Sequence, residues 1–133
     1  MDINELIENF EFLDNWEDKY RYIIELGEKL PPLEPQYHTE EWKVQGCQSQ
    51  VWLLPHKDAA GLISFSGDSD AMIVKGLIAV VLMVFNRKSP SEIKAVAVED
   101  IFAKLGLEEH LSPSRRNGLL AMINKIRHYA EIL

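Results

Sequence analysis

The first thirty residues alternate apolar and polar positions with a period of three to four, which is typical of amphipathic helices. One such segment follows Asp2, which together with Glu5 resembles a capping box. A second follows Asp14-Asn15 and is expected to end at Pro31-Pro32, because proline cannot continue a helix. The apolar faces of these two predicted helices are Ile3, Leu6, Ile7 and Phe10, then Trp16, Tyr20, Ile23, Ile24 and Leu30.

The pattern changes in the middle of the chain to short apolar runs, which indicate strands. Val51–Leu54 leads to Pro55, and Leu62–Ser66 follows a predicted turn at residues 58–61. Adjacent short strands joined by a turn pair antiparallel, and a third short strand could add to an edge. Residues 33–46, which precede the first strand, form a long irregular connection and therefore a candidate functional loop.

Helical patterns return in the second half. Gly67-Asp68-Ser69 is predicted to cap a helix that runs through Asn86 and is apolar almost all round, so it should lie inside the core. Three further signals predict later helices: a capping box at residues 89–92, a stop at Gly106, and a start at Ser112-Pro113. The predicted fold class is α+β, with a small antiparallel sheet and helices packed on one of its faces.

Composition narrows the functional classes. A chain of 133 residues with 47% hydrophobic content fits one globular domain, residues 1–133. The net charge of -7 and the absence of a basic stripe disfavour nucleic-acid binding. The longest apolar run, residues 76–85, is far short of the ~20 residues of a membrane span. The first residues lack a signal-peptide pattern, so a cytoplasmic protein with reduced thiols is expected.

Cys47 is the only cysteine, which excludes an intramolecular disulfide and an all-cysteine zinc site. Gly46 precedes it, Gln48 and Ser49 follow, and the next apolar run begins only at Val51. A glycine allows a sharp turn, and a structural cysteine is usually found within an apolar segment. We therefore predict a reactive thiol at a loop tip, with a small hydrophobic residue that ends a loop as the alternative.

Six segments, in this order and at this spacing, carry a resemblance to a known family: Asn15-Trp16-Glu17-Asp18-Lys19-Tyr20, Tyr22-Ile23-Ile24-Glu25-Leu26-Gly27, Gly46-Cys47-Gln48-Ser49-Gln50-Val51-Trp52, Gly67-Asp68-Ser69-Asp70-Ala71, Ile73-Val74-Lys75-Gly76-Leu77 and His110-Leu111-Ser112-Pro113-Ser114-Arg115. Together they resemble the SufE family of cysteine desulfuration proteins, over nearly the whole chain. One residue departs from the family pattern: Trp42 stands where the resemblance leads us to expect a small polar residue such as asparagine.

The resemblance implies a SufE-like (IscU-like) fold and a sulfur-carrying accessory protein rather than an enzyme. Members accept sulfane sulfur from a pyridoxal-phosphate-dependent cysteine desulfurase, of SufS or CsdA type, and stimulate that desulfurase. They hold the sulfur as a persulfide on a cysteine and pass it to a SufBCD-type iron–sulfur scaffold. The family cysteine aligns on Cys47. The pyridoxal phosphate belongs to the partner, so no cofactor or metal of this chain is expected. We expect a monomer or a weak homodimer.

Other candidate site residues are weighed beside Cys47. Arg115 opposes the dipole of the last helix, so it is predicted either to pair with a carboxylate or to face the thiolate; the alternative is a solvated arginine, as for Arg116. Asp70 is predicted to cap the central helix, and a role at the cysteine loop is the second interpretation. Gln48 and Ser49 are expected near the sulfur, as hydrogen-bond donors or as turn residues.

Aromatic residues and histidines are given structural roles. Trp16 and Trp52 are predicted to anchor the core. No local motif supports a Cys47–histidine pair, so the four histidines are expected to be surface or structural residues: His38, His56, His110 and His128.

Three other functions compete with sulfur delivery to iron–sulfur clusters. The same acceptor chemistry could supply another sulfur pathway, such as RNA thiolation. An iron–sulfur scaffold would need several thiolate ligands, and the chain has one cysteine. A stand-alone cysteine-nucleophile enzyme would turn over a small substrate without a partner, but no base motif is present.

Overall fold

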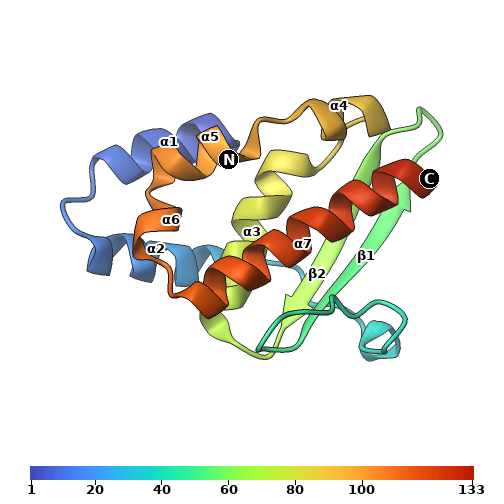
Figure 1. The fold of residues 1–133 in the computed structure, drawn as a ribbon, viewed down its shortest axis with the longest axis horizontal. Helices are drawn as coiled ribbons and strands as arrows, with labels where there is room; N and C mark the ends of the chain where they lie inside the picture. The colour runs from blue at the N-terminus through green and yellow to red at the C-terminus, as the bar shows by residue number, and fades with distance from the viewer.

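The computed structural model describes residues 1–133 and confirms the α+β class, with seven α-helices and one two-stranded sheet (Figure 1). The helices cover one face of an antiparallel hairpin, and no third strand joins an edge of this sheet. The elements are α1 (Ile3–Glu11), α2 (Trp16–Glu28), the 3-10 turn η1 (Pro35–Tyr37), β1 (Val51–Lys57), β2 (Ile63–Ser69), α3 (Met72–Phe85), α4 (Pro90–Ala95), α5 (Val98–Leu105), α6 (Leu107–His110) and α7 (Pro113–Ile132).

Four of the predicted helix starts are confirmed by side-chain caps. The carboxylate of Asp2 accepts the Glu5 N–H at 2.9 Å, and Asn15 caps α2 in the same way. Ser89 begins α4 with both hydrogen bonds of a capping box. At the other end of a helix, Gly106 stops α5 with a φ of 71°, a backbone conformation that favours glycine. Helix α2 ends at Glu28, slightly earlier than the proline pair predicted.

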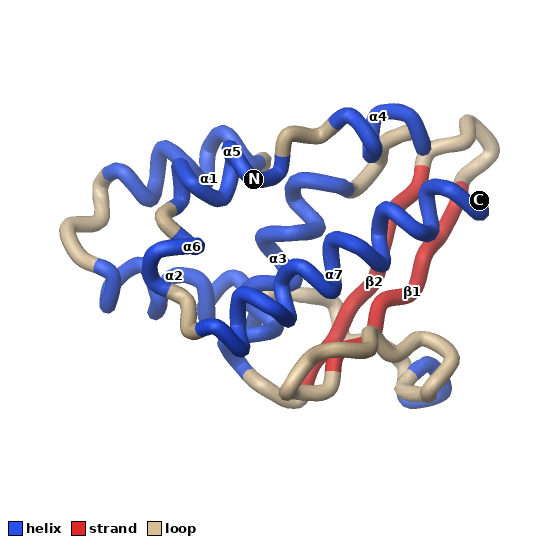
Figure 2. Tube along the Cα trace, in the orientation of Figure 1, coloured by secondary structure: helices blue, strands red, loops and turns tan.

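The hairpin is longer than predicted. Its register runs from Val51 opposite Ser69 to Lys57 opposite Ile63, so the proposed cap at residues 67–69 is wrong: these residues are the end of β2 (Figure 2). Buried and partly exposed residues alternate along the whole of β2, because only one face of the sheet meets the helices. On that face Gly67 lies against Ile78 of α3.

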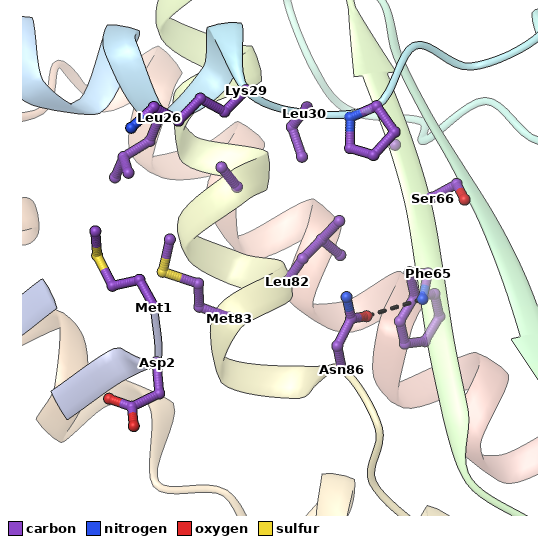
Figure 3. Close-up of a pocket in the computed structure, with 13 residues that line it drawn as sticks. Met1, Asp2, Leu26, Lys29, Leu30, Phe65, Ser66, Leu82, Met83 and Asn86 are labelled. Carbon is purple, nitrogen blue, oxygen red and sulfur yellow. Dashed lines mark hydrogen bonds between the residues drawn. The ribbon is translucent and has the colours of Figure 1, made fainter. Parts of the chain in front are cut away.

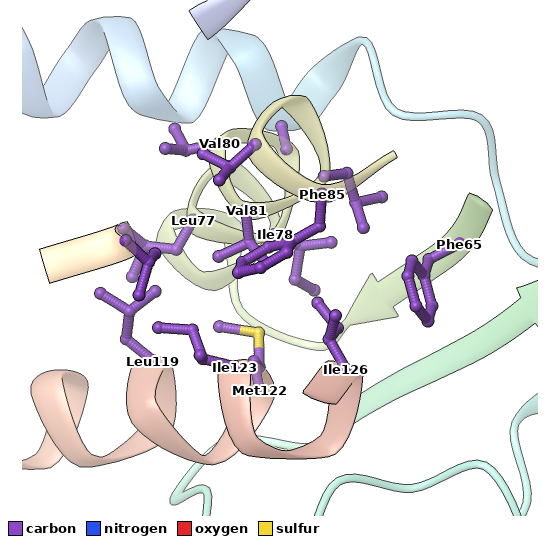
Figure 4. Close-up of a cluster of buried hydrophobic side chains, with 14 of the residues drawn as sticks. Phe65, Leu77, Ile78, Val80, Val81, Phe85, Leu119, Met122, Ile123 and Ile126 are labelled. Carbon is purple, nitrogen blue, oxygen red and sulfur yellow. The ribbon is translucent and has the colours of Figure 1, made fainter. Parts of the chain in front are cut away.

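Helix α3 is the centre of the core, as its apolar sequence predicted. It is almost entirely buried and belongs to a cluster of 31 buried residues. Figure 4 shows its side chains facing those of α7. The labelled residues that meet there are Leu77, Ile78, Val80, Val81 and Phe85 of α3 with Leu119, Met122, Ile123 and Ile126 of α7. This packing provides the rigid support on which the cysteine loop rests.

Helices α2 and α3 cross with their backbones in contact, at Gly27 and Gly76. A Cβ atom added to Gly27 would lie 2.5 Å from the Gly76 nitrogen, and one added to Gly76 would overlap the carbonyl group of Ile23. Only glycine therefore fits at either position without moving a backbone. None of the helices has both the length and the apolar composition that crossing a bilayer requires.

Candidate functional site

The cysteine loop is a closed loop of six residues, Gln45–Gln50, whose two ends meet. The Val44 N–H donates to the Val51 carbonyl at 2.8 Å, and the Leu53 N–H donates to the Trp42 carbonyl at 3.0 Å. Trp42 packs against the core, so this unexpected tryptophan anchors the base of the loop. Within the loop Gly46 has a φ of 90°, which fits its predicted role as a turn residue.

Cys47 is half-buried and points toward α7 rather than into solvent. Its Sγ lies 3.7 Å from the Gly118 carbonyl oxygen, to which the thiol donates a weak hydrogen bond. About 10 Å³ beside it stays open, which is room for one water-sized atom. The cavity is formed by Cys47, Gln48, Ser49, Val51, Val74, Leu77, Ser114, Arg115, Gly118, Leu119 and Met122.

Burial raises the pKa of the Cys47 thiol above its ordinary value, because desolvation disfavours the charged form. The hydrogen bond to a carbonyl acts in the same direction, since it needs the proton on sulfur. In this position the thiol is therefore neutral and a poor nucleophile at neutral pH. The reactive thiolate requires either a change in loop position or a group supplied by a partner.

The half-buried position of Cys47 predicts a pH dependence of its alkylation. The rate of Cys47 modification by iodoacetamide should rise with pH with a midpoint above that of the same cysteine in urea-unfolded protein, because only the thiolate reacts. The unfolded chain is the control, since its thiol is fully solvated. A native midpoint at or below the unfolded one would contradict the raised pKa.

Arg115 ties the start of α7 to the cysteine loop. Ser112 caps this helix through the Arg115 N–H, and the Arg115 guanidinium donates to Ser49 Oγ at 2.9 Å. Of the two roles predicted for Arg115, neither a carboxylate partner nor the thiol is its hydrogen-bond acceptor here. Both Arg115 and Cys47 line the same cavity. Arg116 is exposed.

Asp70 does not cap α3, which corrects the favoured prediction. The helix begins at Met72 with Ala71 as its N-cap and no side-chain hydrogen bond. Asp70 Oδ1 instead accepts the Gln50 N–H at 3.0 Å, while the Ser69 hydroxyl donates to the Gln50 carbonyl at 2.7 Å. Because β2 extends to Ser69, the Asp70 carboxylate lies beside the last loop residue rather than over the helix start. Asp70 thus holds the second end of the cysteine loop.

The histidines do not bond to Cys47. His38 contacts Asp68 at 2.8 Å and His56 contacts Ser66 at 3.1 Å. His110 stacks on the half-buried Trp16, with ring centroids 4.6 Å apart.

His128, the fourth histidine, packs near Tyr129, with ring centroids 6.4 Å apart. Trp52 is also half-buried and packs against His38, so the two tryptophans predicted to anchor the core lie at its margin. No cluster of three metal-ligating side chains is formed anywhere in the chain.

A larger cavity, of about 610 Å³, lies apart from the cysteine loop, between the end of α2, the last turns of α3 and β2 (Figure 3). Its wall is mainly apolar, and its Asn86 side chain accepts the Phe65 N–H at 2.8 Å. Its two titratable side chains, Asp2 and Lys29, form no ion pair with each other, and no cysteine or histidine lines it. The chemistry of the molecule is therefore concentrated at Cys47.

Comparison with known proteins gives a consistent picture. A sequence model of the SufE family, described as an Fe-S metabolism associated domain, matches residues 4–130. An uncharacterised SufE-like protein of Rhizobium meliloti is 52% identical over 132 residues, covering 97% of this chain and 94% of the relative. One of Rhizobium etli is 49% identical over 133 residues, covering 98% and 90%.

A solved structure shares the fold. The solution structure of a hypothetical protein from Thermus thermophilus superposes with a TM-score of 0.75 at 22% identity. The match covers 97% of this chain and 93% of that one, so the arrangement of helices around one hairpin is common to both.

Proposed function

Because the chain belongs to the SufE family of Fe-S metabolism associated proteins, we propose that it accepts sulfane sulfur from a pyridoxal-phosphate-dependent cysteine desulfurase and carries it on Cys47. One observation supports this most directly. The only thiol of the chain stands in a short tethered loop, against an apolar wall with room for one further atom. A carrier needs one such thiol, whereas a second nearby thiol would release the carried sulfur as sulfide.

The transfer is a thiol–persulfide exchange. The Cys47 thiolate attacks the terminal sulfur of the donor cysteine persulfide, a new S–S bond forms at Cys47, and the S–S bond of the donor breaks. The electron pair of the broken bond stays with the donor cysteine, which leaves as a thiolate. The terminal sulfur keeps its proton. No oxidant, metal or cofactor of this chain enters the balance.

We infer that the observed loop position is the protected one. Cys47 is neutral and shielded there, which suits storage, because a persulfide exposed to other thiols is lost by exchange. Transfer requires the loop to move out, with Gly46 as the hinge. Arg115, through Ser49, and Asp70, through Gln50, are the two polar tethers that have to open.

The direct test is sulfur loading. After incubation with a cognate desulfurase, cysteine and pyridoxal phosphate, intact-mass analysis under non-reducing conditions should show the addition of one sulfur atom. Delivery onward to an iron–sulfur scaffold is tested by cluster assembly on a SufBCD-type complex supplied only with the loaded protein. An unmodified chain beside an active desulfurase would overturn the proposal.

We expect the loss of the Arg115–Ser49 hydrogen bond to change the position of the cysteine loop rather than the stability of the fold. Arg115→Ala should speed alkylation of Cys47 roughly fivefold, because a partly exposed hydrogen bond to a charged group contributes about 1 kcal/mol. The melting temperature should be nearly unchanged, since this cation opposes the helix dipole. Alkylation by a neutral maleimide together with a thermal melt measures both effects.

Two variants serve as controls for the tether. Arg116→Ala removes an exposed neighbouring charge and should alter neither rate nor melting temperature. Ser49→Ala keeps the guanidinium and breaks the same hydrogen bond, so it should match Arg115→Ala, with no further gain in the double variant. Additive effects of the two substitutions would show that Arg115 acts on the thiol in another way.

A further inference from the structure

We propose that Gly118 is the residue that fits the cavity to a persulfide rather than to a thiol alone: its missing side chain leaves the space in which the second sulfur is stored. The proposal rests on the proposed function and adds a residue to it. Gly118 is five residues into the last helix, where glycine costs about 1 kcal/mol relative to alanine. A glycine that lowers the stability of its own helix is expected to have a role in the tertiary structure.

The geometry supplies that reason. A Cβ atom added to Gly118 would lie 3.6 Å from Cys47 Sγ and 4.0 Å from Cys47 Cβ. These are ordinary van der Waals distances, so alanine is compatible with the free thiol. Cys47 and Gly118 line one cavity whose open volume is only that of one water-sized atom, so a methyl group on Gly118 would compete for this space with an atom added to the sulfur. Alanine therefore leaves room for the thiol but not for an atom added to it.

The walls suit a sulfur atom. Val74, Leu77 and Met122 give the cavity an apolar and polarizable lining, which favours a neutral or weakly hydrated sulfur over water. The Gly118 carbonyl oxygen accepts the hydrogen bond of the Cys47 thiol, and in the proposed loaded state it is a neighbouring acceptor for the terminal S–H of the persulfide. Arg115, whose guanidinium bonds to Ser49 of the loop, also lines this cavity. Storage thus depends on a fitted space as well as on a tethered loop.

Ala121, one turn after Gly118 on α7, shows that the close approach of α7 to the Cys47 sulfur is confined to Gly118. Gly46 of the loop packs over Ala121, and a Cβ atom added to Gly46 would lie 3.7 Å from the Ala121 Cβ. The loop therefore rests on two small residues, of which Gly118 alone adjoins the sulfur. Leu120, between them in sequence, points to solvent and is 51% exposed.

The test compares the lifetime of the persulfide with the reactivity of the thiol. Wild-type protein and Gly118→Ala are loaded with inorganic polysulfide, so that no partner is needed, and the loss of the added sulfur to dithiothreitol is followed by intact mass. Gly118→Ala should lose its persulfide about four- to tenfold faster, the factor expected when one methylene-sized atom is no longer buried. Its free thiol should alkylate at the wild-type rate. Leu120→Ala is the control and should change neither rate.

Each outcome decides a separate point. Equal persulfide lifetimes in the wild type and Gly118→Ala overturn the role of Gly118 while leaving sulfur carriage intact. Faster alkylation of the free thiol in Gly118→Ala also overturns it, because the loop rather than the storage space would then be disturbed. A wild type that takes up no sulfur, from polysulfide or from a desulfurase, overturns the proposed function and this inference together. A thermal melt confirms that Gly118→Ala is folded.

Discussion

Cys47→Ser is expected to abolish both sulfur loading and stimulation of the desulfurase, while the protein folds as before. A serine hydroxyl occupies nearly the space of the thiol and can donate to the Gly118 carbonyl, so the half-buried seat is kept. It cannot accept sulfane sulfur by thiolate exchange. Since the chain has no other cysteine, no second residue can substitute for it. We expect loss of activity to background, a larger effect than that of any tether variant.

The measurement pairs desulfurase turnover with intact mass and a thermal melt. A variant that loses loading but still stimulates the desulfurase would show that the protein activates its partner by binding alone. Leu120→Ala is a suitable control, because this exposed side chain of α7 lies outside the cavity and its loss leaves the nucleophile in place. It should still take up one sulfur atom.

Gly76→Ala is expected to be the most destabilising single-methyl change in the molecule. The added Cβ would overlap the Ile23 carbonyl, which belongs to a helix backbone and cannot move as a side chain does. Overpacking costs typically about 1–3 kcal/mol, and a backbone contact places this site at the upper end, against a gain of about 1 kcal/mol in helix propensity. A net loss of about 2 kcal/mol lowers the melting temperature by roughly 6–10 °C for a chain of this size.

Gly118→Ala is the matched control for this prediction. It places the same methyl group in a helix where the nearest atom is 3.6 Å away, so its melting temperature should be unchanged or slightly higher. Thermal melts followed by circular dichroism compare the two directly. Equal melting temperatures for both variants would mean that α2 and α3 separate easily at their crossing.

Local signals predicted most helix boundaries, because caps and stops act through neighbouring residues. Ser89, Gly106 and Ser112 each mark a boundary by a hydrogen bond or dihedral angle within four residues. The end of β2 was mispredicted because a Gly-Asp-Ser segment has turn chemistry, whereas its strand conformation comes from pairing with β1. Pairing between distant residues is not visible in a local pattern.

The candidate site was only partly predictable for the same reason. Two signals for the site are local: Cys47 is the only cysteine and lies outside an apolar run, and Arg115 is a cation in the first turn of a helix, where it opposes the dipole. The acceptor for Arg115 is Ser49, 66 residues away, and the residue beside the sulfur is Gly118, 71 residues away. The signal for Gly118 was a glycine inside a helical pattern. The pairing of Asp70 with Gln50 depends on where the strand ends and had no signal of its own.

The closed neck of the cysteine loop limits how far the thiol can travel. The pairs at Val44–Val51 and Trp42–Leu53 hold the two chain ends together, so only Gln45–Gln50 can swing outward without breaking the sheet. A fully extended chain spans at most about 3.6 Å per residue, and a loop must go out and return, so the tip reaches about 10 Å from its neck. A donor sulfur that lies deeper than this within its own protein has to come out to meet Cys47. In that case the donor needs a mobile segment of its own, and the Cys47 loop covers only part of the distance.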